Sequence, residues 1–208
     1  MKYQAVLFDL LTGLLNSWAV WDATAGSAAL GQKWRLEYLK RTYGCGRYRA
    51  YETLVAEAAE AVGLDRNCAD ALESNWADLT PWPGVAPVLS KLTRTHRLGV
   101  VTNCSERLGR IAAERTGVSF DVIMTSEQAG FYKPDPRPYR MALEHLELSA
   151  DRVLFVAGSA YDLFGTAQVG MDAYWHNRVG LAAPAGAPVP LIESRTLEEL
   201  TGLALTAG

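Results

Sequence analysis

Two carboxylates and a lysine stand far apart in this sequence, and they could form one charged site if the fold brings them together. Asp9 follows a short apolar run, Lys133 stands in the string YKPD, and Asp162 follows another apolar run. A lysine between two carboxylates keeps both charged, because like charges within a few ångström repel each other. For Asp9 alone the simpler alternative is a turn residue, since Asp often bonds its own backbone at a strand end.

The elements that must bring these residues together can be predicted from the hydrophobic pattern. Apolar runs typical of buried strands end at Asp9 and span residues 97–103, 120–126, 152–159 and 172–177. Amphipathic runs at residues 105–115, 138–146 and 162–169 lie between the later strands. Strands that alternate with single helices predict an α/β fold with a doubly wound parallel sheet. Ligands bind beyond the carboxyl ends of such strands. The polar residues at these ends are Asp9, Thr102, Asn103, Ser159 and Asp162.

The stretch between the first two strands is predicted to be a helical insertion. Apolar positions recur at mixed spacings of three and four in residues 17–29, 32–42, 51–62 and 69–79. Gly31 and the strings YGCG and GLDRN separate these runs, and the pair Pro81 and Pro83 closes the stretch. We therefore expect two domains, a core made of residues 1–14 and 81–208 and a helical cap made of residues 15–80.

Composition narrows the class of ligand. The formal charge of −3 comes from mixed signs without a basic stripe, which argues against nucleic-acid binding. No apolar run approaches the ~20 residues of a membrane helix, and the N-terminus lacks a signal-peptide pattern, so we expect a cytoplasmic protein. The three cysteines and three histidines have spacings that favour neither disulfides nor a metal site. We expect a small-molecule substrate with no nucleic-acid or membrane partner, and leave a homodimer open.

The polar motifs taken together resemble those of the haloacid dehalogenase superfamily. The matching strings are FDLLTGLL, VVTN, YKPDPRPY and FVAGSAYD, over residues 3–15 and 80–180. The resemblance implies a Rossmann-like core, a cap and a nucleophilic Asp9. Most members are magnesium-dependent phosphatases with a second Asp two residues later, which gives a proton to the leaving alcohol. Leu11 stands there and has no proton to give. Gly158 replaces another acid of the phosphatases, so the site is poor for a hard cation.

The L-2-haloacid dehalogenase branch dispenses with that acid, because a halide leaving group needs no proton. The string KWRLEYL resembles the cap segment in which a Trp-Arg pair closes over the substrate of that branch. The resemblance implies a hydrolase without a cofactor that displaces halide from a small 2-halocarboxylic acid through an aspartyl ester. Two alternatives remain open, a phosphatase that uses Mg²⁺ on a small phosphate ester and a non-catalytic binder with the same fold.

The resemblance also implies a role for each matching residue. Asp9 attacks carbon two of the substrate, and Arg35 receives the halide, although a solvated helix face is an equal alternative for Arg35. Lys133 keeps Asp9 ionised and oriented. Asp162 positions the water that hydrolyses the ester. Thr102 and Asn103 are implied to hold the carboxylate and the halide side of the substrate, and Tyr139 is implied to support the pocket.

Two departures from the branch bear on these roles. The turn after the first strand reads Thr12 then Gly13, where the branch has Gly then Thr, so Thr12 is assigned no role. Ala157 and Ser159 stand where the branch has Ser and Asn. That Asn helps to hold the hydrolytic water, and the serine hydroxyl is shorter and presents different donors. Either Ser159, which we include among the substrate-binding residues, substitutes through another water, or ester hydrolysis is weakened. We expect ester formation to be retained and ester hydrolysis to be slowed but not eliminated, because Asp162 is present.

Overall fold

A single parallel sheet positions the strand ends that the sequence singles out. The computed structural model describes residues 2–206. Its six-stranded sheet has the order β3-β2-β1-β4-β5-β6, and every neighbouring pair is parallel. The strands are β1 (Ala5–Phe8), β2 (Arg97–Thr102), β3 (Val122–Thr125), β4 (Val153–Ala157), β5 (Asp172–His176) and β6 (Ile192–Ser194). The predicted doubly wound parallel sheet is confirmed, with β6 as an additional edge strand.

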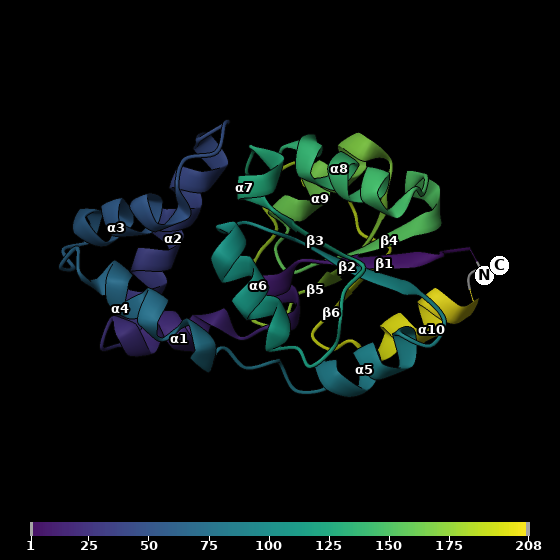
Figure 1. Ribbon diagram of the computed structural model, residues 1–208, viewed down its shortest axis with the longest axis horizontal. Helices are drawn as coiled ribbons and strands as arrows, with labels where there is room; N and C mark the ends of the chain where they lie inside the picture. The colour runs from purple at the N-terminus through teal and green to yellow at the C-terminus, as the bar shows by residue number, and fades with distance from the viewer. Residues whose placement is uncertain (1, 207–208) are drawn as a thin grey trace.

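Helices cover both faces of this sheet (Figure 1). Val6 and Phe8 point to one face of β1, and Ala5 and Leu7 to the other, because side chains alternate along a strand. All four residues are fully buried, which explains why the strand is continuously apolar. The helices on the Phe8 face are α5 (Val85–Leu92), α6 (Glu106–Glu114) and α10 (Glu198–Thr206). Those on the Leu7 face are α8 (Pro136–Leu146) and α9 (Tyr161–Val169), with the short α7 (Ser126–Ala129) after β3.

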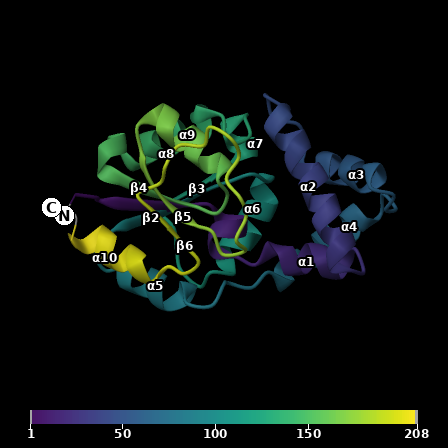
Figure 2. The ribbon, with the colours of Figure 1, turned by 180° about the vertical axis from the view of Figure 1, so that it is seen from behind.

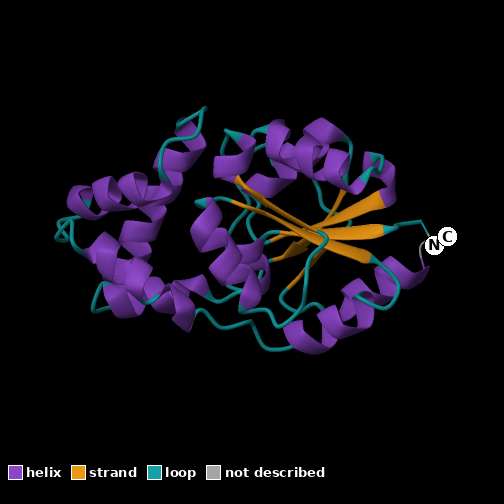
Figure 3. Ribbon diagram, viewed as in Figure 1, coloured by secondary structure: helices purple, strands orange, loops and turns teal. Residues whose placement is uncertain are grey.

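Four further helices form a layer beyond the carboxyl ends of the strands, as Figures 1 and 3 show. They are α1 (Ser17–Thr24), α2 (Ala28–Gly44), α3 (Tyr51–Ala61) and α4 (Cys68–Ser74). Aromatic rings fill the centre of this helical layer: Trp21 and Trp34 meet edge to face with centroids 4.7 Å apart, and Tyr38 and Tyr51 do so at 5.2 Å. No helix in the described part of the chain is long and apolar enough to span a membrane. The division into two domains stays a prediction.

The break between the first two helices differs from the prediction. We expected the break at Gly31, but α2 continues through Gly31, and α1 ends before Gly26, whose φ is +77°. Gly26 adopts this left-handed conformation without the steric cost that a Cβ would bring. Gly31 instead permits close packing of the two helices, because a Cβ there would lie 2.6 Å from the Cα of Asp22. Similarly, the run predicted over residues 69–79 divides into α4 and a 3-10 turn at Trp76–Asp78.

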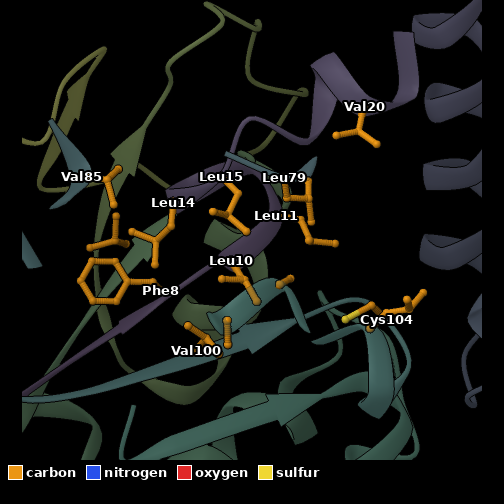
Figure 4. Close-up of a cluster of buried hydrophobic side chains, with 14 of the residues drawn as sticks. Phe8, Leu10, Leu11, Leu14, Leu15, Val20, Leu79, Val85, Val100 and Cys104 are labelled. Atoms are coloured by element: carbon orange, nitrogen blue, oxygen red, sulfur yellow. The ribbon is translucent and has the colours of Figure 1, made fainter. Parts of the chain in front are cut away.

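The turn after β1 is anchored in the core. Residues Leu10–Leu14 form one π-helical turn, in which Leu10 and Leu14 are fully buried. Figure 4 shows these side chains gathered with Phe8 and Val100 on one side of the sheet. Because its leucines belong to the core, the turn is fixed relative to the end of β1.

Two neighbouring stretches of chain join the helical layer to the sheet. Leu15 forms an isolated antiparallel bridge with Pro81. The backbone N–H of Asn16 donates to the carbonyl of Thr80 at 2.8 Å, and that of Trp82 donates to the carbonyl of Leu14 at 2.9 Å. The view from behind in Figure 2 shows the helical layer standing to one side of the sheet, as in Figure 1. The chain thus leaves the core and returns to it at adjacent points.

Candidate active site

Asp9 both caps its own turn and faces a cavity. The side chain is buried, and its Oδ2 accepts hydrogen bonds from the backbone N–H groups of Thr12 at 3.0 Å and Gly13 at 2.9 Å, and from the Thr12 hydroxyl. Its Oδ1 accepts one hydrogen bond, from Lys133 Nζ at 2.8 Å. A carboxylate oxygen has about two lone-pair sites. Oδ2 is therefore fully occupied by donors from the turn, whereas Oδ1 keeps one site free.

Lys133 joins Asp9 to the second carboxylate. Its Nζ lies 2.8 Å from Asp9 Oδ1 and 2.9 Å from Asp162 Oδ1, and only 5% of its side chain is exposed. Burial lowers the pKa of Lys133, but the charges of Asp162 and Asp9 outweigh burial, so the pKa is raised. Burial opposes ionisation of Asp9 as well, yet the charge of Lys133 and the donors of the turn hold the pKa of Asp9 below its usual value. At neutral pH Lys133 is protonated and Asp9 is ionised.

Asp162 lies in the first turn of α9 and has one oxygen without a partner. Its Oδ1 accepts hydrogen bonds from Lys133 and from the Tyr139 hydroxyl at 2.9 Å. Its Oδ2 is buried and has no hydrogen-bond partner among the described residues. Burial raises the pKa of Asp162, and the nearby charge of Asp9 adds to this against the opposing charge of Lys133. Asp162 is thus the carboxylate of the pair that is better suited to accept a proton.

Arg35 is buried, and not on a solvated helix face. Its exposed fraction is 5%, and its guanidinium carbon lies 4.0 Å from the centroid of the Trp18 ring. Nη1 donates to Ser17 Oγ at 2.6 Å, and that hydroxyl donates to the carbonyl of Leu11. Nε has no partner, and Arg35 forms no ion pair within residues 2–206. Burial lowers the pKa of Arg35, against the opposing effect of Tyr51 and Asp9. A buried guanidinium with a free donor is suited to receive an anion.

The cavity lies between the turn after β1, the start of α9 and the helical layer. Apolar and aromatic side chains make up much of its wall, among them Leu11, Trp18, Leu39, Trp82 and Tyr161. The charged side chains of the wall are Asp9, Asp162, Lys133, Arg35 and Arg178. Three cations against two carboxylates leave one positive charge in excess, which favours a small anionic ligand with an apolar part.

The two residues at the end of β2 differ in their relation to this cavity. Asn103 lines it, but its amide clamps the backbone of Lys133: Oδ1 accepts from the N–H at 2.8 Å, and Nδ2 donates to the carbonyl at 3.1 Å. Thr102 is buried and is not among the described residues that line the cavity. Tyr139 also lies outside the wall and contacts the site through Asp162. Direct contact of Thr102, Asn103 or Tyr139 with a substrate stays a prediction.

Comparisons with known proteins show the family to which the chain belongs. The sequence profile of the haloacid dehalogenase-like hydrolases matches residues 6–175. The chain belongs to this family. It is 27% identical over 198 residues to haloacetate dehalogenase H-2 of Moraxella sp. (strain B), with 87% of this chain and 88% of that protein covered. It is 26% identical over 215 residues to (S)-2-haloacid dehalogenase H-109 of Pseudomonas putida, with 95% and 96% covered. A crystal structure of a dehalogenase with an intermediate complex superposes with a TM-score of 0.85, at 26% identity over 97% of each chain.

The turn of this haloacid dehalogenase-like hydrolase leaves no room for the acid that phosphatases carry at position 158. A Cβ on Gly158 would overlap Thr12 Oγ1 and Asp9 Oδ2. The carboxylates of the cavity are therefore Asp9 and Asp162, and both are engaged with Lys133. No group of three His, Cys, Asp or Glu side chains in the described residues is arranged to hold a metal ion. These donors do not fit a hard cation, which takes about six oxygen ligands.

Some residues of the site have positions that the sequence motifs do not reveal. Thr12 is assigned no role by the motifs, yet its hydroxyl donates to Asp9 because residues 10–14 form a π-helical turn. Tyr43 and Arg178 line the cavity from the helical layer and from the loop after β5. No motif marks them, because their place depends on how α2 and that loop pack. Of the two tryptophans of α1, Trp18 lines the cavity and Trp21 packs against Trp34.

Proposed function

We propose that this chain is a 2-haloacid dehalogenase, which displaces halide from a small 2-halocarboxylic acid through an ester on Asp9. The observation that carries the proposal is a buried, ionised Asp9 held by Lys133 in one cavity with the unpaired cation Arg35. Leu11 stands where a leaving alcohol would need an acid, which a halide does not. The names of the relatives support the same reaction class.

In the first step, Asp9 Oδ1 attacks carbon two of the substrate. Oδ1 is the attacking atom because Oδ2 already accepts three hydrogen bonds from the turn. The new bond joins Oδ1 to carbon two, and the carbon–halogen bond breaks with its electron pair on the halide. Arg35 receives the halide through its free Nε. The excess cation of the cavity offsets the repulsion between the anionic substrate and the anionic nucleophile.

In the second step, water attacks the Cγ of the Asp9 ester. The carbonyl oxygen of that ester is Oδ2, and the three donors of the turn stabilise the negative charge that develops on it. Asp162 takes a proton from the water and returns it to the leaving oxygen, which is the former Oδ1. The water oxygen stays in the Asp9 carboxylate, the product is a 2-hydroxy acid, and one proton is released. This gives Thr12 a part in ester hydrolysis.

No metal ion is part of the proposed reaction. A magnesium phosphatase, the other enzymatic alternative, needs an acid at position 11 and oxygen ligands at position 158, where this chain has Leu11 and Gly158. We therefore expect phosphate esters to be poor substrates.

A panel of substrates tests the proposal. The purified protein is incubated with chloroacetate, bromoacetate and both enantiomers of 2-chloropropionate, and with several phosphate monoesters as controls. We expect halide release from at least one haloacid, as a burst of about one equivalent per enzyme followed by slower turnover, because Ser159 replaces Asn. Mass spectrometry of quenched enzyme should find the adduct on the peptide that contains Asp9. Ser159→Asn should shorten the life of this adduct. If the folded protein releases no halide and carries no adduct with any haloacid, the proposal is wrong.

A further inference from the structure

Tyr43 is a side chain of the helical layer that reaches the sheet beside Asp162. It lies in the last turn of α2, and its hydroxyl oxygen is 3.5 Å from Ser159 Oγ. Its ring stacks on that of Tyr161, with centroids 4.2 Å apart and 25° between the planes. Tyr161 begins α9, the helix that carries Asp162. Tyr43, Ser159 and Asp162 all line the cavity that contains Asp9.

The polar groups at this corner have hydrogen-bonding capacity that the described residues do not use. Asp162 Oδ2 is buried and has no donor. Ser159 Oγ accepts from the backbone N–H of Tyr161 at 3.3 Å. The 3.5 Å between the hydroxyls of Tyr43 and Ser159 is long, because hydroxyl hydrogen bonds are usually about 2.7–2.8 Å. Polar groups of this kind, gathered at one corner of a cavity, are typical partners of an ordered water, which makes about three hydrogen bonds.

We propose that Tyr43 holds the water that hydrolyses the Asp9 ester, together with Ser159 and Asp162. This inference rests on the proposed function and adds a residue from the helical layer to its second step. The water accepts a hydrogen bond from the Tyr43 hydroxyl and donates to Asp162 Oδ2, which takes its proton as the oxygen bonds to Asp9 Cγ. The bond from Cγ to Oδ1 then breaks, and the product leaves with Oδ1 and that proton.

The chemistry of Tyr43 suits a donor to this water. Burial raises the pKa of Tyr43, and the nearby charges of Asp162 and Asp9 raise it further against the opposing hydrogen bond of Ser159. The hydroxyl is therefore protonated at neutral pH and can donate a hydrogen bond. It also partly compensates for the short side chain at position 159, because Tyr43 belongs to α2 of the helical layer whereas Ser159 follows β4 of the sheet, and their hydroxyls meet.

The test compares Tyr43→Phe with Tyr48→Phe. Tyr43→Phe removes the hydroxyl and keeps the ring that stacks on Tyr161. Tyr48 is a matched control, because it also stacks on a tyrosine of the core, Tyr132, with centroids 5.4 Å apart, and lies outside the cavity wall among the described residues. Rapid-quench single turnovers with an active haloacid measure halide release and decay of the Asp9 ester separately. Single turnovers in ¹⁸O-labelled water follow entry of the label into Asp9.

We expect Tyr43→Phe to slow ester decay and ¹⁸O entry by roughly tenfold, the size expected for one lost hydrogen bond. The rate of ester formation should stay within about twofold. In the steady state kcat and KM should fall together, so that kcat/KM, which reports the first step, is unchanged. Tyr48→Phe should match the wild-type protein in each measurement. In a protein that already carries Ser159→Ala, Tyr43→Phe should slow ester decay by a smaller factor than it does in the wild-type protein, because both changes act on one water.

Three results would overturn the inference. One is wild-type ester decay in Tyr43→Phe, and another is a parallel fall of kcat/KM, which marks a purely structural role. The third is a double variant in which ester decay is slowed by the full product of the factors measured for Tyr43→Phe and Ser159→Ala alone. Each of these leaves dehalogenation by the wild-type protein intact, so the proposed function stands. Failure of the wild-type protein to form any ester on Asp9 overturns the proposed function, and this inference with it.

Discussion

Replacing Lys133 with methionine should strongly destabilise the fold, because two buried carboxylates then lose the cation between them. The side chains of Asp9 and Asp162 are 9% and 5% exposed, and each has an oxygen within 2.9 Å of Lys133 Nζ. Methionine fills most of the same space without the charge. Removal of one partner from a buried ion pair costs about 3–5 kcal/mol. That loss is a large part of the roughly 5–15 kcal/mol that stabilises a typical domain.

The size of this loss should depend on pH. Without Lys133, burial and mutual repulsion raise the pKa values of the two carboxyl groups in the folded protein above their unfolded values. The folded variant then binds more protons than the unfolded chain, so its free energy of unfolding falls as pH rises. The difference from the wild-type protein should be fully present at pH 8. It should shrink as pH falls toward 5 and the carboxyl groups take up protons.

Urea unfolding followed by the fluorescence of the six tryptophans measures these free energies at several pH values. The control is the double variant Lys133→Met, Asp162→Asn, which keeps Asp9 with its three donors from the turn. It should regain about 1–3 kcal/mol at neutral pH, because it no longer buries two negative charges. The reasoning is refuted if Lys133→Met unfolds within about 1 kcal/mol of the wild-type protein throughout this range. In that case the two carboxylates are not charged together.

Four further expectations concern activity. Asp9→Asn should abolish halide release while the circular dichroism spectrum stays that of the wild type, since the amide keeps the shape of the carboxylate; turnover by a protein shown not to deamidate would contradict the role of Asp9. Arg35→Ala should slow the halide burst about 100-fold, as for loss of a donor to a developing charge, and a near-normal burst in stopped-flow measurements would place the halide elsewhere. Excess chelator should leave halide release unchanged, whereas loss on chelation and recovery with Mg²⁺ would favour the phosphatase alternative. As pH falls, Asp162 with its raised pKa should take up a proton before Asp9 with its lowered pKa. Ester hydrolysis then loses its base, so the ester detected by mass spectrometry should accumulate at acidic pH. A constant ester fraction at acidic pH would argue against Asp162 as the base.

Much of the fold was predictable because the central strands are buried on both faces. A continuous apolar run such as Val153–Ala157 is typical of a strand that is buried on both faces of a sheet. The helices that alternate with these strands make neighbouring strands run in the same direction. β6 lacks that signal, because Ile192–Ser194 is short and partly exposed at the edge of the sheet. The helix break predicted at Gly31 was wrong, because this glycine allows close contact with Asp22 and does not form a turn.

Only the part of the candidate site that lies outside the helical layer could be predicted from the sequence. Asp9 and Asp162 meet because parallel strands end at one edge, a rule that needs no side-chain detail. Lys133 reaches them from the loop before α8, where the Asn103 side chain binds its backbone. Burial of Arg35 could not be decided from its helix, because it depends on the Trp18 ring of another helix. The contact of Thr12 with Asp9 depends on one π-helical turn, for which the sequence carries no periodic pattern.

The paired connections between the sheet and the helical layer bear on how such an enzyme can diversify. Since the chain leaves the core near Leu15 and returns near Pro81 beside it, a longer or wholly different insertion needs no change in the span between its ends. The entropy of closing such a loop grows only slowly with its length. Arg35 and Tyr43 travel with the insertion, whereas Asp9 and its lysine remain in the core. Under the proposed mechanism, exchange of residues 16–80 among relatives would thus alter how the halide and the hydrolytic water are bound while Asp9 and Lys133 stay unchanged.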